Sequence, residues 1–188
     1  MILTSPSLTG QILIAMPLMG DTRFNQSVIF LCAHSPEGAM GIIVNQPLKT
    51  PKFVDLLRQL EIEPTPPSRE IRICTGGPVD NNRGFVLHSP DGTTESSLDV
   101  DGTHMLTASL DILQAVASGG GPERCLMALG YAGWGPGQLD EEMKQNAWLN
   151  APADEHLLFD ADHTSKWQRA LAKLRINPAM LSSNAGRA

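Results

Sequence analysis

Short runs of apolar residues alternate with polar breaks along the first half of the chain, and this pattern predicts β-strands. Residues 11–16, 27–33 and 40–45 are rich in apolar and β-branched side chains, and Gly, Pro, Asn or Asp bounds each run. The tripeptide at 36–38, Pro-Glu-Gly, suits a tight turn and predicts that the second and third runs form an antiparallel hairpin. Four further strands are predicted at 70–75, 84–89, 94–99 and 103–107.

Apolar residues at helical spacing predict helices, mostly in the second half. The first helix is expected from Thr50 and Pro51 to Leu60, because Thr can cap a helix and Pro suits its first position. Ser109 can cap a second helix, which the glycines after residue 118 end. The remaining elements follow in order: a strand at 126–131, a helix at 138–148, a short strand at 156–159 and a helix near 166–174.

Strands that cluster early, helices that cluster late and several hairpins predict an α+β fold. We expect a mixed, largely antiparallel sheet flanked by about four helices. The chain has 188 residues, 41% of them apolar, which suits one domain with a substantial core. That domain is expected over residues 1–177, and the small and polar residues 178–188 are expected to form a flexible C-terminal tail.

Charge and cysteine content narrow the functional classes. The formal net charge of −6 argues against non-specific electrostatic binding to nucleic acid or to an anionic membrane, so no direct nucleic-acid binding is expected. The longest apolar runs fall far short of the roughly 20 residues of a membrane-spanning helix, and the N-terminus does not resemble a signal peptide. The cysteines form no CxxC pair, which is typical of reduced thiols in a cytoplasmic protein.

Two glycine-dense connections are the strongest candidates for a binding site. Residues 129–138 surround Tyr131 and Trp134 with small residues, and Gly76-Gly77-Pro78 precedes Arg83. Glycine-rich backbone can bind an anion through free amides, and an arginine beside it can hold a carboxylate or phosphate. The alternative is packing, because glycine also allows two backbones to approach closely. The acidic residues 140–142 favour packing for the first connection.

Catalytic and metal signatures are weak. The five histidines lack the spacing that places two imidazoles on one metal ion, so we expect no metal site and no cofactor. The chain has no G-x-S-x-G motif for a nucleophilic serine. The sequence therefore favours a protein without enzymatic activity, and the alternative is a hydrolase that uses His34 or His88 as its base.

Several stretches of the chain also match a known family pattern. The residues at 10–17 read GQILIAMP, and the other stretches lie at 21–29, 34–45, 76–88, 109–122 and 129–149. These segments, in this order, resemble the YqgE/AlgH family of bacterial proteins over residues 5–175. The resemblance implies an α+β fold around a mixed, partly barrel-like sheet. It also implies a cytoplasmic protein, described by analogy as a transcriptional regulator, with no established activity.

The polar and glycine residues of these stretches concentrate in loops, where function usually resides. We therefore expect a regulatory protein that binds a small anionic ligand or a protein partner where the loops converge. No catalytic residue is assigned, and the sequence leaves the identity of the partner and the oligomeric state open. The predicted binding residues are Asp21, Phe24, Ser27, His34, Gly38, Asn45, Gly76, Gly77, Pro78, Arg83, His88, Tyr131, Gly133 and Trp134.

Overall fold

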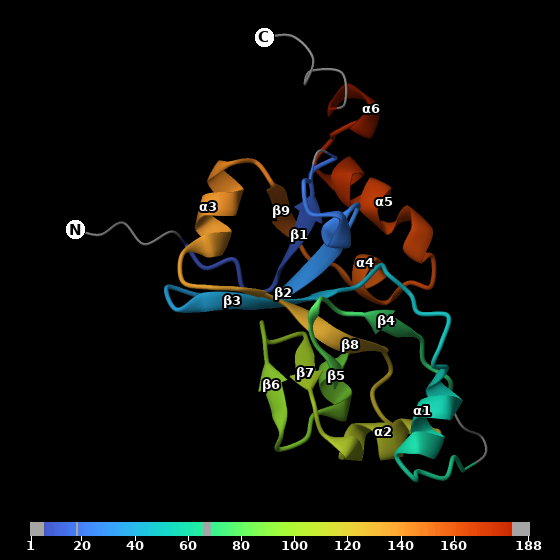
Figure 1. Ribbon diagram of the computed structural model, residues 1–188. Helices are drawn as coiled ribbons and strands as arrows, with labels where there is room; N and C mark the ends of the chain where they lie inside the picture. Colours follow the sequence, from blue (N-terminus) through green and yellow to red (C-terminus); the bar gives the residue numbers. More distant parts are fainter. Residues whose placement is uncertain (1–5, 18, 66–68, 182–188) are drawn as a thin grey trace.

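The computed structural model describes residues 6–17, 19–65 and 69–181, and nine strands form one sheet (Figure 1). The strands are β1 (Gln11–Ala15), β2 (Val28–Ser35), β3 (Gly38–Ile43), β4 (Ile73–Thr75), β5 (Val79–His88), β6 (Ser97–Asp99), β7 (Met105–Thr107), β8 (Cys125–Trp134) and β9 (Trp148–Pro152). Their hydrogen-bonded order is β6-β7-β5-β8-β3-β2-β1-β9, with β4 beside β8. The β4–β8 pair is parallel and the other pairs are antiparallel, which confirms the mixed, largely antiparallel sheet.

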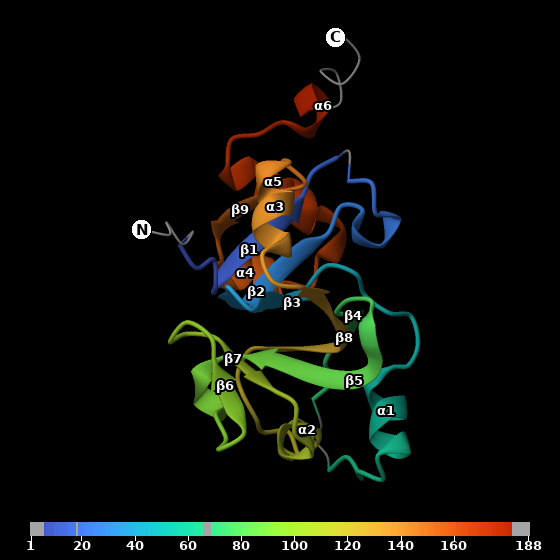
Figure 2. The ribbon, with the colours of Figure 1, turned by 60° about the vertical axis from the view of Figure 1, so that its left-hand side comes forward.

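Strand β8 joins the two halves of the sheet. Its first half pairs with β5 on one side, where Ala128 is opposite Phe85, and with β4 on the other, where Ala128 is beside Cys74. Its last residues pair with β3, and Trp134 is opposite Ala39. Because one strand serves both halves, the sheet curls into a half-barrel rather than lying flat (Figure 2).

Six α-helices flank this sheet in the described part of the chain, where about four were predicted. Two of them, α1 (Phe53–Gln59) and α2 (Leu110–Ala117), lie on the same side of the molecule as β5 (Figure 1). The other four lie with β1 and β9: α3 (Gln138–Lys144), α4 (Glu155–Phe159), α5 (Lys166–Lys173) and α6 (Pro178–Leu181). Short 3-10 helices occur at η1 (Thr22–Phe24), η2 (Pro90–Gly92) and η3 (His163–Ser165). Within the described residues, no helix has the length and apolar character that crossing a membrane requires.

Buried apolar side chains form three clusters. The largest fills the inside of the curled sheet, where Phe30 of β2 and Trp167 of α5 both lie. A second cluster lies under α1 and α2, and a third lies under α3. Strand β1 buries both of its faces, since Ile12 belongs to the first cluster and Leu13 to the third. Burial on both faces explains why this strand is a continuous apolar run in the sequence.

The predicted elements differ from the structure mainly after residue 138. The predicted strand at 156–159 is wrong: these residues belong to α4, because the Asp154 carboxylate accepts a hydrogen bond from the Leu157 N–H at 2.8 Å and caps a helix. The predicted helix at 138–148 ends at Lys144 and is followed by β9. Within the predicted tail, Pro178–Leu181 form α6, and residues 182–188 lie outside the described part of the chain.

The two glycines after β4 allow the chain to lie directly on β8. A Cβ atom on Gly76 would lie 2.2 Å from the carbonyl oxygen of Gly130, and one on Gly77 would lie 2.0 Å from the carbonyl carbon of Tyr131. The N–H of Ile43 donates to the carbonyl of Gly76 at 2.8 Å, which ties the end of β3 to the same point. Close backbone approach therefore accounts for both glycines.

We expect Gly130→Ala to lower the free energy of unfolding by about 3 kcal/mol or more, and Gly102→Ala by about 1 kcal/mol. Both glycines have a left-handed φ, +76° and +82°, so both substitutions strain the backbone. At Gly130 the new Cβ would also lie 2.6 Å from the carbonyl oxygen of Gly77, whereas nothing lies within 4 Å of it at Gly102. Equilibrium unfolding in urea measures both losses. Equal losses would contradict a tight contact at Gly130.

Candidate functional site

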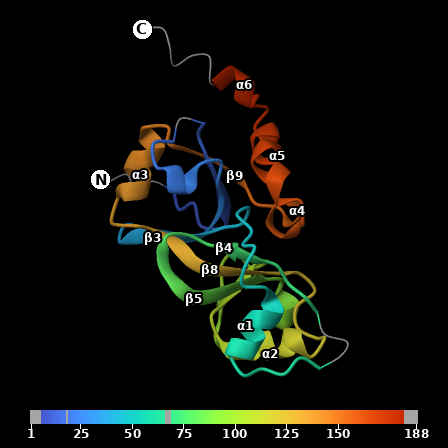
Figure 3. The ribbon, with the colours of Figure 1, turned by 45° about the vertical axis from the view of Figure 1, so that its right-hand side comes forward.

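A hollow of about 350 Å³, here called the loop cavity, lies between the η1 loop, the segment after β4, the end of β8 and α3. Figure 3 shows η1 and α3 on the same side of the sheet, although they are far apart in the sequence. Five of the predicted binding residues line this cavity: Asp21, Phe24, Pro78, Gly133 and Trp134. The rest of its lining was not predicted and consists of Met19, Arg23, Val79, Gln138, Glu142, Ala147 and Trp148.

The Glu142 carboxylate organises one wall of the loop cavity. Its Oε2 accepts hydrogen bonds from the indole Nε1 of Trp134 at 2.9 Å and of Trp148 at 2.8 Å. Its Oε1 accepts a third from Gln138 Nε2 at 2.9 Å. The ring of Trp148 meets the rings of Trp134 and Phe24 edge to face, with centroids 6.0 and 5.6 Å apart. One carboxylate therefore fixes two of the three aromatic side chains of the cavity.

The other charged groups of the loop cavity neutralise each other. The Arg23 guanidinium contacts the Asp21 carboxylate at 2.7 Å, and this hydrogen bonding lowers the pKa of Asp21. Asp21 also accepts a hydrogen bond from the Arg23 backbone N–H at 3.0 Å, which closes the turn that begins η1. The lining thus carries a net charge of about −1, which does not favour the small anion predicted at these loops.

Ser27 and Asn45 lie in the scaffold that holds the adjoining loop. Ser27 is fully buried, and its Oγ accepts a hydrogen bond from Gln46 Nε2 at 2.8 Å. The Asn45 side chain accepts from the Val28 N–H at 2.9 Å and donates to the Gln26 carbonyl at 2.8 Å. Both side chains are occupied in joining the end of β3 to the start of β2.

The two histidines of the hydrolase alternative do not line the loop cavity. His34 Nδ1 accepts the Leu8 N–H at 3.1 Å, and its Nε2 lies 3.6 Å from Asp140, with the side chain 4% exposed. His88 is fully buried; its Nδ1 contacts the Ser89 carbonyl at 2.8 Å and its Nε2 contacts Thr107 Oγ1 at 2.7 Å. Burial lowers the pKa of His88. Both side chains are buried, so the geometry gives neither ring access to a substrate.

The remaining predicted residues do not line the loop cavity. A Cβ on Gly38 would lie 2.5 Å from the Trp134 carbonyl oxygen, so Gly38 lets the β2–β3 turn approach β8. The Arg83 guanidinium lies 5.1 Å from the ring centroid of Phe85, which Tyr131 meets edge to face at 5.9 Å. Arg83 and Tyr131 therefore both contact the ring of Phe85 and do not line the loop cavity.

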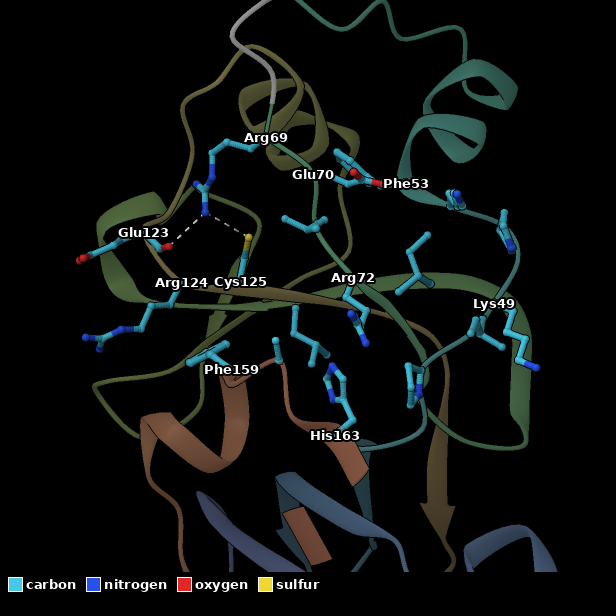
Figure 4. A pocket seen from close by; sticks show the side chains of 18 residues that line it. Lys49, Phe53, Arg69, Glu70, Arg72, Glu123, Arg124, Cys125, Phe159 and His163 are labelled. Carbon is cyan, nitrogen blue, oxygen red and sulfur yellow. Dashed lines mark hydrogen bonds between the residues drawn. The ribbon is translucent and has the colours of Figure 1, made fainter. Parts of the chain in front are cut away.

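A larger hollow of about 840 Å³, here called the basic cleft, was not predicted from the sequence. It lies between the start of α1, the segment before β4, the start of β8 and the α4–η3 connection (Figure 4). Its charged lining consists of five basic residues, Lys49, Lys52, Arg69, Arg72 and Arg124, against two acidic ones, Glu70 and Glu123. The excess of positive charge contrasts with the net charge of −6 of the whole chain.

Four of the five cations of the basic cleft fall into two groups. The Arg69 guanidinium donates to the carbonyls of Gly120 and Glu123, both at 3.0 Å, and Arg124 forms an ion pair with Glu155. By contrast, the side chains of Lys49 and Arg72 have no hydrogen bond or ion pair with any residue in the described ranges. Figure 4 shows the Arg72 side chain extending toward His163. Arg72 and Lys49 are therefore available to a ligand.

Two buried nitrogen groups lie close together in the chain: His163 lines the basic cleft, and Lys166, three residues later, does not. Lys166 is fully buried, and its Nζ donates to the carbonyls of Val44 at 3.2 Å and Leu158 at 3.1 Å. Burial lowers the pKa of Lys166 to about 8. Burial, reinforced by the charge of Lys166, lowers the pKa of His163 to about 4, so this imidazole is neutral at pH 7 and donates its Nδ1 proton to Val44.

In the part of the chain that the structure describes, the ligating side chains do not gather as a metal site would require. Among residues 6–17, 19–65 and 69–181, no group of three or more His, Cys, Asp or Glu side chains is placed to hold an ion. The cysteines are free thiols, and burial raises the pKa of Cys74 to about 11 and that of Cys125, in the basic cleft, in the same direction. Neither thiol is therefore poised as a thiolate nucleophile.

Comparison with known proteins assigns the family. A model of the AlgH-like family matches residues 12–179. The chain belongs to the AlgH-like family. This membership confirms the resemblance seen in the sequence. A UPF0301 protein of Rhodospirillum rubrum is 54% identical over 181 residues, covering 96% of this chain and 94% of that protein. A UPF0301 protein of Gluconobacter oxydans is 52% identical over 183 residues, covering 96% and 98%.

Solved structures show the same fold. The solution structure of the AlgH protein from Pseudomonas aeruginosa aligns with a TM-score of 0.76 at 40% identity and covers 100% of both chains. A crystal structure of a Corynebacterium diphtheriae protein aligns with a TM-score of 0.71, covering 97% of this chain and 95% of that one. Its identity is 18%, so it supports the fold alone. The AlgH-like fold is thus retained while most of the sequence changes.

We expect the stability of the protein to rise between pH 8 and pH 10.5 relative to that of Lys166→Met. The pKa of Lys166 is lower in the folded state than in the unfolded chain, so over this range the unfolded chain binds more protons and folding is favoured as pH rises. The relative gain is at most about 3 kcal/mol. Urea unfolding across this pH range measures it, with Lys173→Met, which removes an exposed lysine of the same helix, as the control. Parallel curves for the wild type and Lys166→Met would contradict a charged lysine in a buried setting.

Proposed function

We propose that this AlgH-like protein acts by binding a small anion, such as a phosphorylated or carboxylated metabolite, in the basic cleft. The observation that carries the proposal is the pair of unpartnered cations, Lys49 and Arg72, in a hollow whose charged lining is mainly basic. A guanidinium forms strong, paired hydrogen bonds to carboxylate and phosphate. The volume of about 840 Å³ lies in the range of small-molecule sites.

The charge distribution supports the basic cleft as the anion site, rather than the glycine-rich loops where the sequence analysis predicted the anion. Those loops enclose a cavity whose unpaired charge is the Glu142 carboxylate, and they leave Arg83 outside it. The basic cleft instead combines positive charge with partial enclosure by α1 and the α4–η3 connection. Attraction to an anion is stronger in such a recess than on an open surface, because the surrounding protein excludes water.

The groups at the basic cleft suit a protein that binds a ligand without catalysing a reaction of it. His163 is neutral and uses Nδ1 for Val44, and the Cys125 thiol has a raised pKa. A protein that holds a metabolite without transforming it can report the level of that metabolite, and we propose this regulatory role for the chain. The free thiols support a reducing compartment, the bacterial cytoplasm, as the place where it acts.

We expect Arg72→Gln to weaken anion binding about tenfold while leaving the melting temperature of the free protein almost unchanged. The substitution removes one charge-assisted hydrogen bond to the anion, and Arg72 has no described partner whose loss would cost stability. Thermal-shift screening with phosphate, pyrophosphate and nucleoside phosphates identifies an anion that stabilises the wild type. Isothermal titration of that anion then compares the variants.

Arg83→Gln provides the matched control, because it makes the same change of charge at an exposed arginine outside the cleft. It should bind the anion as the wild type does. A loss of affinity in Arg83→Gln together with wild-type affinity in Arg72→Gln would return the anion to the glycine-rich loops. Failure of every tested anion to stabilise the wild type would count against the proposal as a whole.

A further inference from the structure

Glu142 in the loop cavity carries a negative charge that no described cation neutralises. Its donors, the indoles of Trp134 and Trp148 and the amide of Gln138, are all uncharged. The one cation in the lining, Arg23, is bound to Asp21. Three neutral hydrogen bonds hold the carboxylate in place and leave its charge to act on whatever occupies the cavity.

Aromatic side chains from three distant segments surround this charge. Phe24 comes from η1, Trp134 from the end of β8 and Trp148 from the start of β9. The Arg23 guanidinium lies 5.8 Å from the ring centroid of Phe24, so this aromatic cluster already attracts one cation at its rim. Aromatic rings beside a carboxylate are the environment in which alkylated ammonium groups are recognised, because the rings attract a cation without requiring hydrogen bonds from it.

We propose that the loop cavity binds an organic cation, with an alkylated ammonium group that lies in the hollow beside the aromatic cluster, within electrostatic reach of the Glu142 carboxylate. The volume of about 350 Å³ suits a small molecule. Gly133, Pro78 and Val79 add lining without a polar side chain. This site is independent of the anion proposal, since the loop cavity and the basic cleft share no lining residue and have opposite charge.

The experiment compares two probes of nearly identical shape. Choline carries a trimethylammonium group, and 3,3-dimethylbutan-1-ol is its uncharged counterpart. Tryptophan fluorescence follows both titrations, because two of the three tryptophans line the cavity. We expect saturable binding of choline to the wild type and binding of the alcohol at least about tenfold weaker. Equal signals from both probes, or no saturable signal from choline, would overturn the proposal.

The variant Glu142→Gln tests the carboxylate. It removes the charge while retaining one oxygen that can accept the indole hydrogen bonds, and we expect it to bind choline about tenfold more weakly. Glu141→Gln, at the neighbouring exposed position of α3, is the matched control and should bind choline like the wild type. Near-ultraviolet circular dichroism monitors whether the tryptophans keep their packing in Glu142→Gln.

A structural role alone predicts a different result. If Glu142 serves only to lock Trp134 and Trp148, the wild type will not distinguish choline from the alcohol, whatever happens to the variant. The comparison of the two probes on the wild type therefore shows whether the cavity recognises a positive charge, even if Glu142→Gln does not fold. Wild-type affinity for choline in a folded Glu142→Gln protein would also overturn the assignment.

Discussion

The backbone of residues 76 and 77 lies against the backbone of β8 so closely that no side chain fits between them. A Cβ at either position would come within 2.0–2.2 Å of a main-chain atom of residues 130–131. This contact fixes the parallel register of β4 on β8, in which Cys74 lies beside Ala128. It also fixes what lies at each end of β4. Residues 69–73 lead into the basic cleft, and Pro78 and Val79 border the loop cavity.

The two cavities differ in charge, although residues 69–79, which include β4, border both. In the basic cleft, five basic side chains outnumber two acidic ones, whereas in the loop cavity a carboxylate held by neutral donors is the unpaired charge. A chain with a net charge of −6 would, with charges spread evenly, leave both hollows acidic. The separation of charge therefore favours two sites for ligands of opposite sign over one site for a single ligand.

The strand pattern was readable from the sequence because most of β1, the first five residues of β2 and the second half of β3 are buried and rich in apolar residues. Short elements could not be predicted in this way. The four residues at 156–159 fit a strand or one turn of helix equally well, and the Asp154 cap decides between them. The glycine pair at 76–77 was visible as a backbone requirement, but the sequence could not say whether a ligand or another strand would lie against it.

The site residues that the sequence did not predict share one property: only tertiary contacts bring them together or show their partners. The cations of the basic cleft come from residues 49–52, 69–72 and 123–124, and no spacing rule connects these segments. Glu142 reads as one of three acidic residues at a helix start, and only the folded chain shows the indoles of Trp134 and Trp148 bound to it. Asp21 was predicted only as a binding residue, and its local pairing with Arg23 was not predicted either.

The buried Lys166 affects the protonation of His163, which lines the basic cleft. Burying an ammonium group without a carboxylate partner costs stability, and the pKa of Lys166, lowered to about 8, is the measure of that cost. The carbonyls of Val44 and Leu158 satisfy its hydrogen bonds but do not neutralise its charge. The same charge, after burial itself, lowers the pKa of His163, which does line the cleft. Lys166 therefore helps to keep that imidazole neutral, so the positive charge of the cleft comes from its lysine and arginine side chains and not from His163.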